Sequence, residues 1–210
     1  EFDLIIFDRY QSRGVLPIIY YDNIARYVEQ GGAVLVAAGP ELADSGSLYR
    51  TPLSSVLPAQ PSGQIIERPY HAMLSTDGER HPITRGLDED AEGETPPWSR
   101  WFRLVDAAPG QGSTLMTGAD EKPLLVVNRE GEGRVALLLS DHAWLWARGF
   151  EGGGPYVPLL RRMAHWLMKE ADLEEEALRA RQQGDSLIVE RQTMADEVNA
   201  VTVETPTGES

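Results

Sequence analysis

Ala33-Val34-Leu35-Val36-Ala37-Ala38-Gly39-Pro40-Glu41 is the stretch that decides the fold of this chain. Six consecutive apolar residues predict a buried strand, and Gly39-Pro40 predicts a sharp turn at its end. Apolar residues at helical spacing over 18–28, followed by Gly31-Gly32, predict a helix just before that strand. A short apolar run at 4–8 predicts an earlier strand. Together these elements form a βαβ unit, which implies parallel strands joined by a right-handed crossover.

The composition excludes several classes of partner and site. The chain has 210 residues, 41% of them apolar and 25% charged, with no cysteine and a net charge of −14 at pH 7. No apolar run approaches the roughly 18 residues that suggest a membrane span, so we expect no membrane contact by this part of the protein. The negative charge argues against nucleic acid, whose binding begins with basic side chains on phosphates. Absence of cysteine excludes disulfides and thiol nucleophiles, and it leaves both the cytoplasm and the periplasm open.

A second pair of apolar strands lies later in the chain. Residues 124–128 and 134–140 flank the glycine-containing turn 129–133, which predicts an antiparallel hairpin at the edge of the sheet. Apolar residues on one face of 156–169 predict another helix. These patterns give an α/β domain over 1–170, a three-layer sandwich with a mainly parallel sheet.

The remainder of the chain has a different pattern. Charged residues over 171–184 predict a helical linker. Two alternating strands within 185–210 predict the start of a C-terminal β module or a tail.

The order of these elements resembles class I glutamine amidotransferase-like domains, over roughly residues 1–169. The nearest kinds are trehalose-utilisation-type relatives and the amidotransferase-like domains of large bacterial membrane proteins. The resemblance implies a flavodoxin-like fold, with the family's first strand and helix preceding Glu1. The resemblance rests on five segments: the strand 2–8, the helix ending at Gly31-Gly32, the strand 35–39, the motif His81-Pro82-Ile83-Thr84-Arg85-Gly86-Leu87, and the hairpin with Leu124-Leu125-Val126-Val127 and Gly131-Glu132-Gly133-Arg134-Val135.

By position, the resemblance places the family's nucleophilic cysteine at Gly39 and its late histidine at His142. Trp144 stands where the acidic partner of that histidine is expected. The resemblance therefore implies that this chain is a non-catalytic domain of a larger bacterial protein, and that this larger protein could be anchored in a membrane. Such a domain would serve ligand sensing or contact with other domains of the same protein or with a protein partner.

Glycine at the end of this strand has two interpretations. The turn before Pro40 is expected to need a positive φ at Gly39. Alternatively, backbone N–H groups of Gly39, Glu41 and Leu42 attract an anionic ligand. The candidate ligand-binding residues are therefore Gly39, Pro40, Glu41 and His142.

Asp141-His142 is the strongest polar pair, because it follows a strand at the sheet edge where such folds bind ligands. The rival hypothesis is a hydrolase or transferase in which His142, with Asp141 or Glu41, activates a water. Adjacent strand residues point to opposite faces, so Asp141 is not a simple orienting partner. We expect these residues to fix the following loop by hydrogen bonds. A water-accessible pocket joining Gly39, Glu41 and His142 would instead favour chemistry.

Two further groups complete the candidates. Trp144, Trp146 and Phe150 predict either an aromatic contact surface or core packing. His71 and His81 do not match a metal-ligand spacing with the nearby carboxylates, so neither a metal nor a cofactor is expected. The sequence leaves the oligomeric state open.

Overall fold

The computed structural model describes residues 2–89, 95–195, 198 and 200–203. The contacts divide the chain into a main unit, residues 1–174, and a C-terminal unit, residues 175–210. Among the described residues, no helix is long and apolar enough to cross a membrane.

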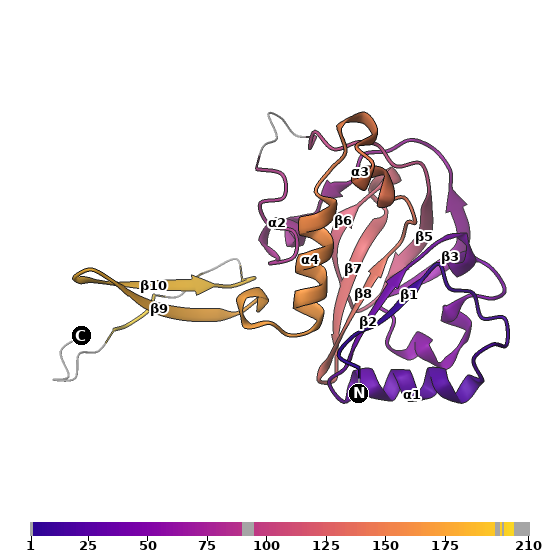
Figure 1. The fold of residues 1–210 in the computed structure, drawn as a ribbon, viewed down its shortest axis with the longest axis horizontal. Coiled ribbons are helices and arrows are strands. Elements are labelled where there is room, and N and C mark those ends of the chain that lie inside the picture. Colours follow the sequence, from indigo (N-terminus) through magenta and orange to yellow (C-terminus); the bar gives the residue numbers. More distant parts are fainter. Residues whose placement is uncertain (1, 90–94, 196–197, 199, 204–210) are drawn as a thin grey trace. The chain divides into compact units, whose positions relative to one another are not determined.

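The main unit is built on a mixed sheet, whose six described strands are shown in Figure 1. Strands β1, β2 and β8 are parallel neighbours, whereas β7, β6 and β4 join by antiparallel pairing. Of the six described strands, four (β1, β2, β6 and β8) run in one direction and two (β4 and β7) run in the other. Most strands therefore point the same way, and the predicted α/β class is confirmed. The order across the sheet is β1 (Ile5–Asp8), β2 (Ala33–Ala37), β8 (Gly133–Leu138), β7 (Pro123–Glu130), β6 (Ser113–Thr117) and β4 (Met73–Leu74).

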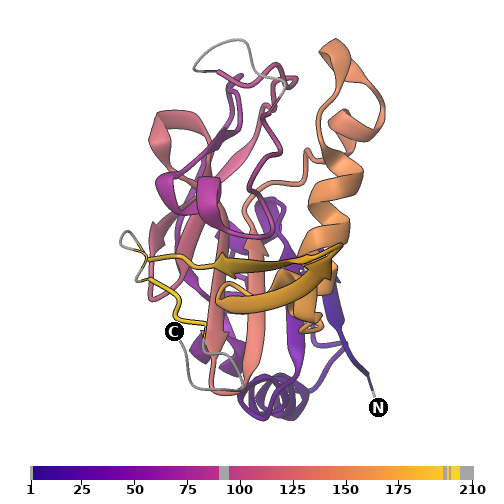
Figure 2. The same cartoon turned by 90° about the vertical axis from the view of Figure 1, so that its left-hand side faces the viewer.

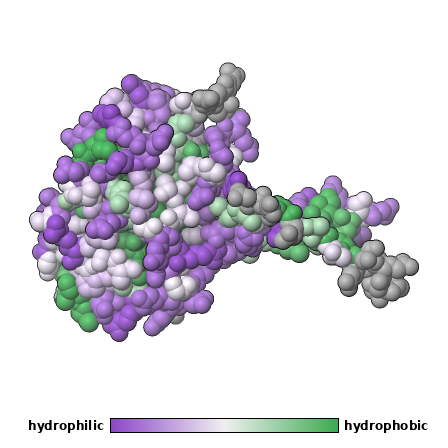
Figure 3. Space-filling view, turned by 180° about the vertical axis from the view of Figure 1, so that it is seen from behind, coloured by the Kyte–Doolittle hydropathy of each residue, from purple (hydrophilic) through white to green (hydrophobic). Residues whose placement is uncertain are grey.

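Two longer helices cover the centre of this sheet. Helices α1 (Ile18–Glu29) and α4 (Tyr156–Leu167) each contact both β2 and β8. Figure 2 shows α4 running alongside the strands. Seen from behind, the surface is mostly hydrophilic with separate hydrophobic patches (Figure 3). The shorter helical segments are η1 (Pro40–Ala43), η2 (Leu48–Arg50), η3 (Pro52–Ser55), α2 (Thr76–Arg80), η4 (Ala119–Glu121), α3 (Trp144–Ala147), η5 (Phe150–Gly152) and η6 (Ala171–Leu173).

A second, two-stranded sheet lies in the long connection between β2 and β6. Strand β3 (Ala59–Ile66) pairs antiparallel with β5 (Leu104–Pro109). An isolated bridge joins Tyr70 to Trp101 next to it. This connection matters for the site, because it brings the segment before β5 to the end of β8.

The predicted βαβ unit is confirmed, with β1 and β2 parallel and α1 between them. The predicted hairpin is also present as β7 and β8, but its placement at the sheet edge was wrong. β8 lies in the interior, with β2 on its other side, and β6 and β4 lie beyond β7. All residues of β8 and the first five of β7 are buried. Such continuous apolar runs are typical of strands covered on both faces rather than of edge strands.

The turn of this hairpin packs directly on the end of α1. Backbone N–H groups of Glu132 and Arg134 donate to the carbonyls of Glu29 and Gly32, at 3.0 and 3.1 Å. A Cβ atom at Gly133 would overlap the carbonyl oxygen of Val28. Glycine is therefore required at 133 by the close approach of two backbones.

The predicted helical linker over 171–184 was wrong. Only η6 is helical there, and residues Ala177–Gln183 form strand β9, antiparallel to β10 (Ser186–Gln192). Gly184 has a φ of +60°, and the register leaves Gly184-Asp185 as a two-residue turn. Turns of this kind favour a hairpin over a continuous helix. The predicted strand within 185–192 is present, and the later part of 185–210 lies largely outside the described residues.

We expect Gly133→Ala to destabilise the main unit by about 2–3 kcal/mol, because the added methyl group overlaps the Val28 carbonyl in a packed region. Gly14→Ala is the control: its φ is +74° but its Cβ would meet open space, so the cost is about 1–2 kcal/mol. Chemical unfolding followed by tryptophan fluorescence measures both. Equal costs would show that the α1 contact does not require glycine.

Candidate functional site

The candidate site lies where β1, β2 and β8 end at the same edge of the sheet. Parallel strands present their carboxyl ends together, and ligands of such sheets bind there. Arg9 follows β1, Glu41 lies just beyond β2, and Asp141 and His142 follow β8. The structure therefore brings together the three side chains selected from the sequence. Arg9 and Arg103, which the sequence analysis did not select, complete the group.

Arg9 and Glu41 form an ion pair above Gly39. The distance from Arg9 Nη2 to Glu41 Oε1 is 2.8 Å. A Cβ atom at the buried Gly39 would overlap Glu41 Oε2 and lie 2.8 Å from Arg9 Nε. The space that a side chain at position 39 would enter is thus occupied by this ion pair.

The positive φ expected at Gly39 was wrong. Its φ is −112° and its ψ is −166°, which is extended backbone. Pro40 then begins the 3₁₀ helix η1, with proline in the first turn. A larger residue here would displace the ends of the Glu41 and Arg9 side chains, whereas the backbone conformation does not require glycine.

The Glu41 carboxylate is held in its charged form. Burial alone would raise its pKa, but the hydrogen bond from Arg9 and the Arg9 charge outweigh burial and lower the pKa below its usual range. Glu41 Oε2 has no hydrogen-bond partner within the described part of the chain. The Glu41 carboxylate therefore pairs with Arg9. Because its pKa is lowered, Glu41 is a weak base at neutral pH.

Asp141 is bound by two arginines. Its side chain is 7% exposed and lies 3.4 Å from Arg9 Nη1 and 3.1 Å from Arg103 Nη1. Arg103 also pairs with Glu67 at 3.1 Å. Buried charges need such partners, because desolvation of an isolated carboxylate costs several kcal/mol. Asp141 thus links the ends of β1 and β8 to the segment before β5.

His142 is fixed by the backbone rather than by a carboxylate. Its Nδ1 accepts a hydrogen bond from the Phe102 N–H at 3.1 Å, whereas its Nε2 lies 3.8 Å from Asp141 Oδ1, beyond hydrogen-bond distance. Burial lowers the pKa of His142, and the Arg103 charge lowers it further against the opposing effect of Asp141. The neutral ring therefore carries its proton on Nε2. In this state Nε2–H is available as a hydrogen-bond donor, and the Nδ1 lone pair is used by the Phe102 N–H.

Ser140 strengthens the same connection. Its hydroxyl donates to the Arg103 carbonyl at 2.6 Å and accepts from the His142 N–H at 3.2 Å. The Tyr70 hydroxyl donates to that carbonyl as well, at 2.9 Å. Residues 140–142 therefore tie the end of β8 to residues 102–103.

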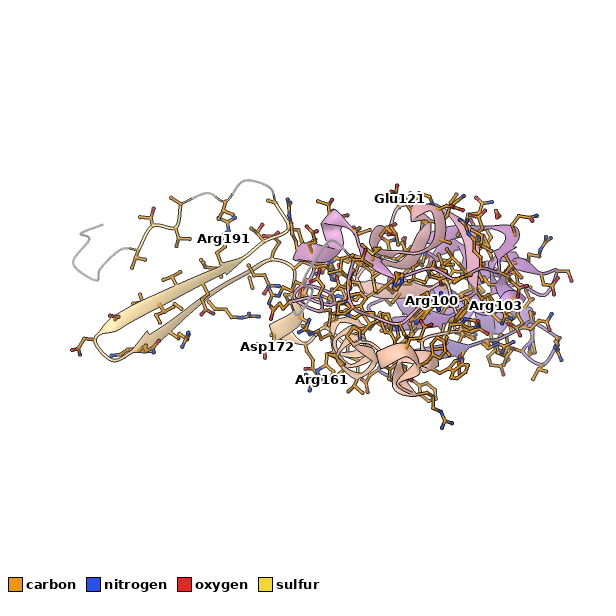
Figure 4. The ribbon with its side chains drawn as sticks, turned by 90° about the horizontal axis from the view of Figure 1, so that it is seen from above. Arg100, Arg103, Glu121, Arg161, Asp172 and Arg191 are labelled. Atoms are coloured by element: carbon orange, nitrogen blue, oxygen red, sulfur yellow. The ribbon has the colours of Figure 1, made fainter. Side chains whose placement is uncertain are left out.

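Aromatic side chains lie next to this polar group: the Phe102 ring lies 6.4 Å from the His142 ring, and Trp144 follows His142 by two residues. Phe102 contacts Phe150 edge-on at 5.7 Å, and the Arg100 guanidinium lies 5.9 Å from the Phe102 ring. Trp144 is 54% exposed and Phe150 37%. Figure 4 labels Arg100 and Arg103 in the main unit.

Of the three candidate aromatic residues, two are exposed, as a contact surface requires, and one packs in the core. Trp144 and Phe150 are exposed, whereas Trp146 is buried and packs on Trp98 and Trp101 with ring centroids 5.3 and 4.7 Å apart. The α3 turn presents one tryptophan outward and anchors itself in the core with the other.

Two of the other three histidines, His71 and His81, make contacts within the fold. His71 Nδ1 lies 2.9 Å from the Trp98 carbonyl. His81 is buried, accepts from the Ile83 N–H at 3.2 Å and packs edge-on against Trp166. Within the described residues no group of three or more potential ligands could hold a metal ion.

Comparisons with known proteins give the fold only. No protein-family model and no curated protein sequence matches the chain. Two solved structures of cytoplasmic proteins from Salmonella typhimurium are similar, with TM-scores of 0.63 and 0.62 and identities of 18% and 20%; each match covers 79% of this chain and 72% of the other. A β-galactosidase from Rahnella sp. R3 matches with a TM-score of 0.52 and 16% identity, covering 92% of this chain but 27% of the enzyme. At these identities the likeness supports a shared α/β fold.

We expect ¹⁵N–¹H correlation NMR to find the His142 proton on Nε2 at pH 7 and a titration midpoint below 6.5. A lowered pKa means that the unfolded chain binds the proton more readily. The stability from neutral His142 is therefore fully present above about pH 6.5 and is lost as the pH falls through the lower folded-state pKa. His142→Gln should flatten this part of the pH profile. A proton on Nδ1 at pH 7 would contradict the assignment.

The crowding at Gly39 is testable by a double-mutant cycle. We expect Gly39→Ala to cost about 1–3 kcal/mol of unfolding free energy, because the methyl group displaces the Arg9–Glu41 pair. In a Glu41→Ala background the cost should fall by about 1 kcal/mol or more. Glu67→Ala is the matched control background, since Glu67 pairs with Arg103 and is not among the atoms nearest to a Gly39 Cβ. Equal costs in all backgrounds would refute the crowding.

Proposed function

We propose that the main unit is a non-catalytic, glutamine amidotransferase-like domain with a flavodoxin-like layered arrangement, and that its site face contacts a protein partner. The order of elements that resembles this family supports the assignment, as do the parallel strands β1, β2 and β8 that end at one site. The partner is another domain of the same protein or a separate protein.

The observation that carries the non-catalytic role is the Arg9–Glu41 ion pair over Gly39. A nucleophile on the turn needs room to stand clear of the sheet and a base to take its proton. Here position 39 has no reactive atom and its space is filled, and the nearest histidine presents an N–H. The water-activating alternative needs the His142 ring to accept a proton, which the Phe102 N–H opposes.

Protein contact is the better supported of the two non-catalytic roles. Exposed tryptophan, phenylalanine and arginine are the side chains enriched at the centres of protein interfaces. Arg100 and Phe150 both lie against Phe102 beside the site, and the exposed Trp144 follows His142 by two residues. Small-molecule sensing needs an enclosed pocket, whereas the polar groups here are mostly paired with one another.

We also propose that this unit is one part of a larger, membrane-anchored bacterial protein, with the unit itself on the cytoplasmic or periplasmic side. The Rahnella match supports the first point, since a similar fold forms about a quarter of that bacterial enzyme. A full-length gene product with membrane segments on either side would support the anchoring.

Ammonia release tests the absence of catalysis. We expect the full 210-residue chain, incubated with glutamine, to release no more ammonia than a protein-free blank, because no nucleophile stands at position 39. The His142→Ala variant is measured in parallel. Release by the wild type that this variant abolishes would overturn the proposal.

Photo-crosslinking tests the contact role. A photoreactive phenylalanine replaces Trp144 or Phe150 in the full-length protein in its native cells, and Asp77, an exposed residue on α2, is the control position. The proposal expects one discrete adduct from positions 144 and 150 and none from 77. The absence of adducts at all three positions would contradict it.

A further inference from the structure

Residues 149–153, here called the strap, follow α3 and contain the short helix η5. Four of these five residues have a positive φ: 71° at Gly149, 45° at Glu151, 94° at Gly152 and 79° at Gly153. Glycine adopts such angles without strain, whereas a residue with a side chain rarely does. Glu151 is therefore the strained backbone position of the strap.

The Glu151 side chain holds that strained conformation. Both of its carboxylate oxygens bind the Arg100 guanidinium: Oε2 accepts from Nε at 3.0 Å, and Oε1 accepts from Nη2. Oε2 also lies 3.3 Å from the Arg100 backbone nitrogen, whose N–H it accepts. A two-point pair of arginine and carboxylate has a fixed geometry and is stronger than a single contact. The pair therefore opposes the backbone strain at the same residue.

Apart from this pair, the middle of the strap is loosely packed. A Cβ atom at Gly149 or Gly152 would meet nothing within 4 Å. The buried Gly153 is the fixed end, because its carbonyl accepts a hydrogen bond from the Ser99 N–H at 2.7 Å. The two open glycines flank the middle of the strap, so a change of backbone angles can occur there.

The strap places Phe150 beside the candidate site. The Phe150 ring contacts Phe102 edge-on, with centroids 5.7 Å apart. Phe102 in turn donates the backbone hydrogen bond that fixes His142, at 3.1 Å. A movement of the strap would therefore change what covers Phe102 next to His142.

We propose that the Arg100–Glu151 pair is a latch, which holds the strap in a strained conformation and keeps Phe150 against Phe102. When the pair breaks, Glu151 relaxes to a negative φ, the backbone turns at the two open glycines, and the Phe150 ring leaves Phe102. The latch acts in the free chain and does not depend on a partner protein. It sets how much of the Phe102 ring is accessible beside the site, which the contact role alone does not specify.

Fluorine NMR tests the latch. 4-Fluorophenylalanine replaces Phe150 in the 210-residue chain, and its fluorine shift reports the packing of that ring. We expect one resonance, displaced from the value measured in denaturant. Arg100→Gln and Glu151→Gln should each move it toward the denatured value, with the fold unchanged by circular dichroism. Arg148→Gln is the control, because it removes the same charge from an exposed arginine next to the strap. A resonance that stays in place in either pair variant, or that moves equally in the control, would overturn the proposal.

Glycine at position 151 tests the strain that the latch opposes. In the Arg100→Gln background, Glu151→Gly removes the side chain that makes a positive φ costly, so the resonance should return toward its wild-type position. Glu151→Ala in the same background is the matched control. Alanine also lacks the carboxylate but keeps a Cβ atom, so the resonance should stay displaced. Equal positions for the glycine and alanine variants would contradict the strain and overturn the latch.

Discussion

The position of β8 is the constraint on which the main unit depends. It accepts β2 as a parallel neighbour on one side and β7 as an antiparallel neighbour on the other, so the βαβ unit and the later strands become one sheet. The arrangement requires the β7–β8 turn to fit against the end of α1, where Gly133 leaves room for the Val28 carbonyl. Because β8 runs with β1 and β2, its last residues reach the same edge as theirs. The site exists because of this alignment.

At that edge, the charged side chains pair with one another. Two arginines pair with three carboxylates across the ends of β1, β2, β3 and β8 and the segment before β5. The ion pairs restrict the conformations of the side chains that form them. The backbone N–H of Phe102 determines which ring nitrogen of His142 carries the proton. The polar group therefore stabilises the meeting point of five chain segments. The neighbouring Trp144 and Phe150 side chains remain exposed.

Sequence patterns predicted the local elements better than their surroundings. The βαβ unit, the hairpin and the meeting of Glu41, Asp141 and His142 followed from apolar runs and from the geometry of parallel strands. The interior place of β8 was missed although its uninterrupted burial was visible as an apolar run, and β9 was missed although Gly184-Asp185 marked a tight turn. Arg9 and Arg103 had no local signal, because their roles arise only when distant segments meet. The conformation of Gly39 was equally hidden, since crowding by Glu41 is a tertiary effect.

The extended main chain at Gly39 has a consequence for how this protein can change. A residue held at positive φ would favour glycine at this turn, but a φ of −112° is open to every L-amino acid except proline. The atoms that crowd a side chain at position 39 belong to the Glu41 and Arg9 side chains, and single substitutions can change either of them. The scaffold has therefore kept the option of acquiring a reactive group at the tip of β2 without rebuilding its backbone, which makes it a practical starting point for installing new chemistry.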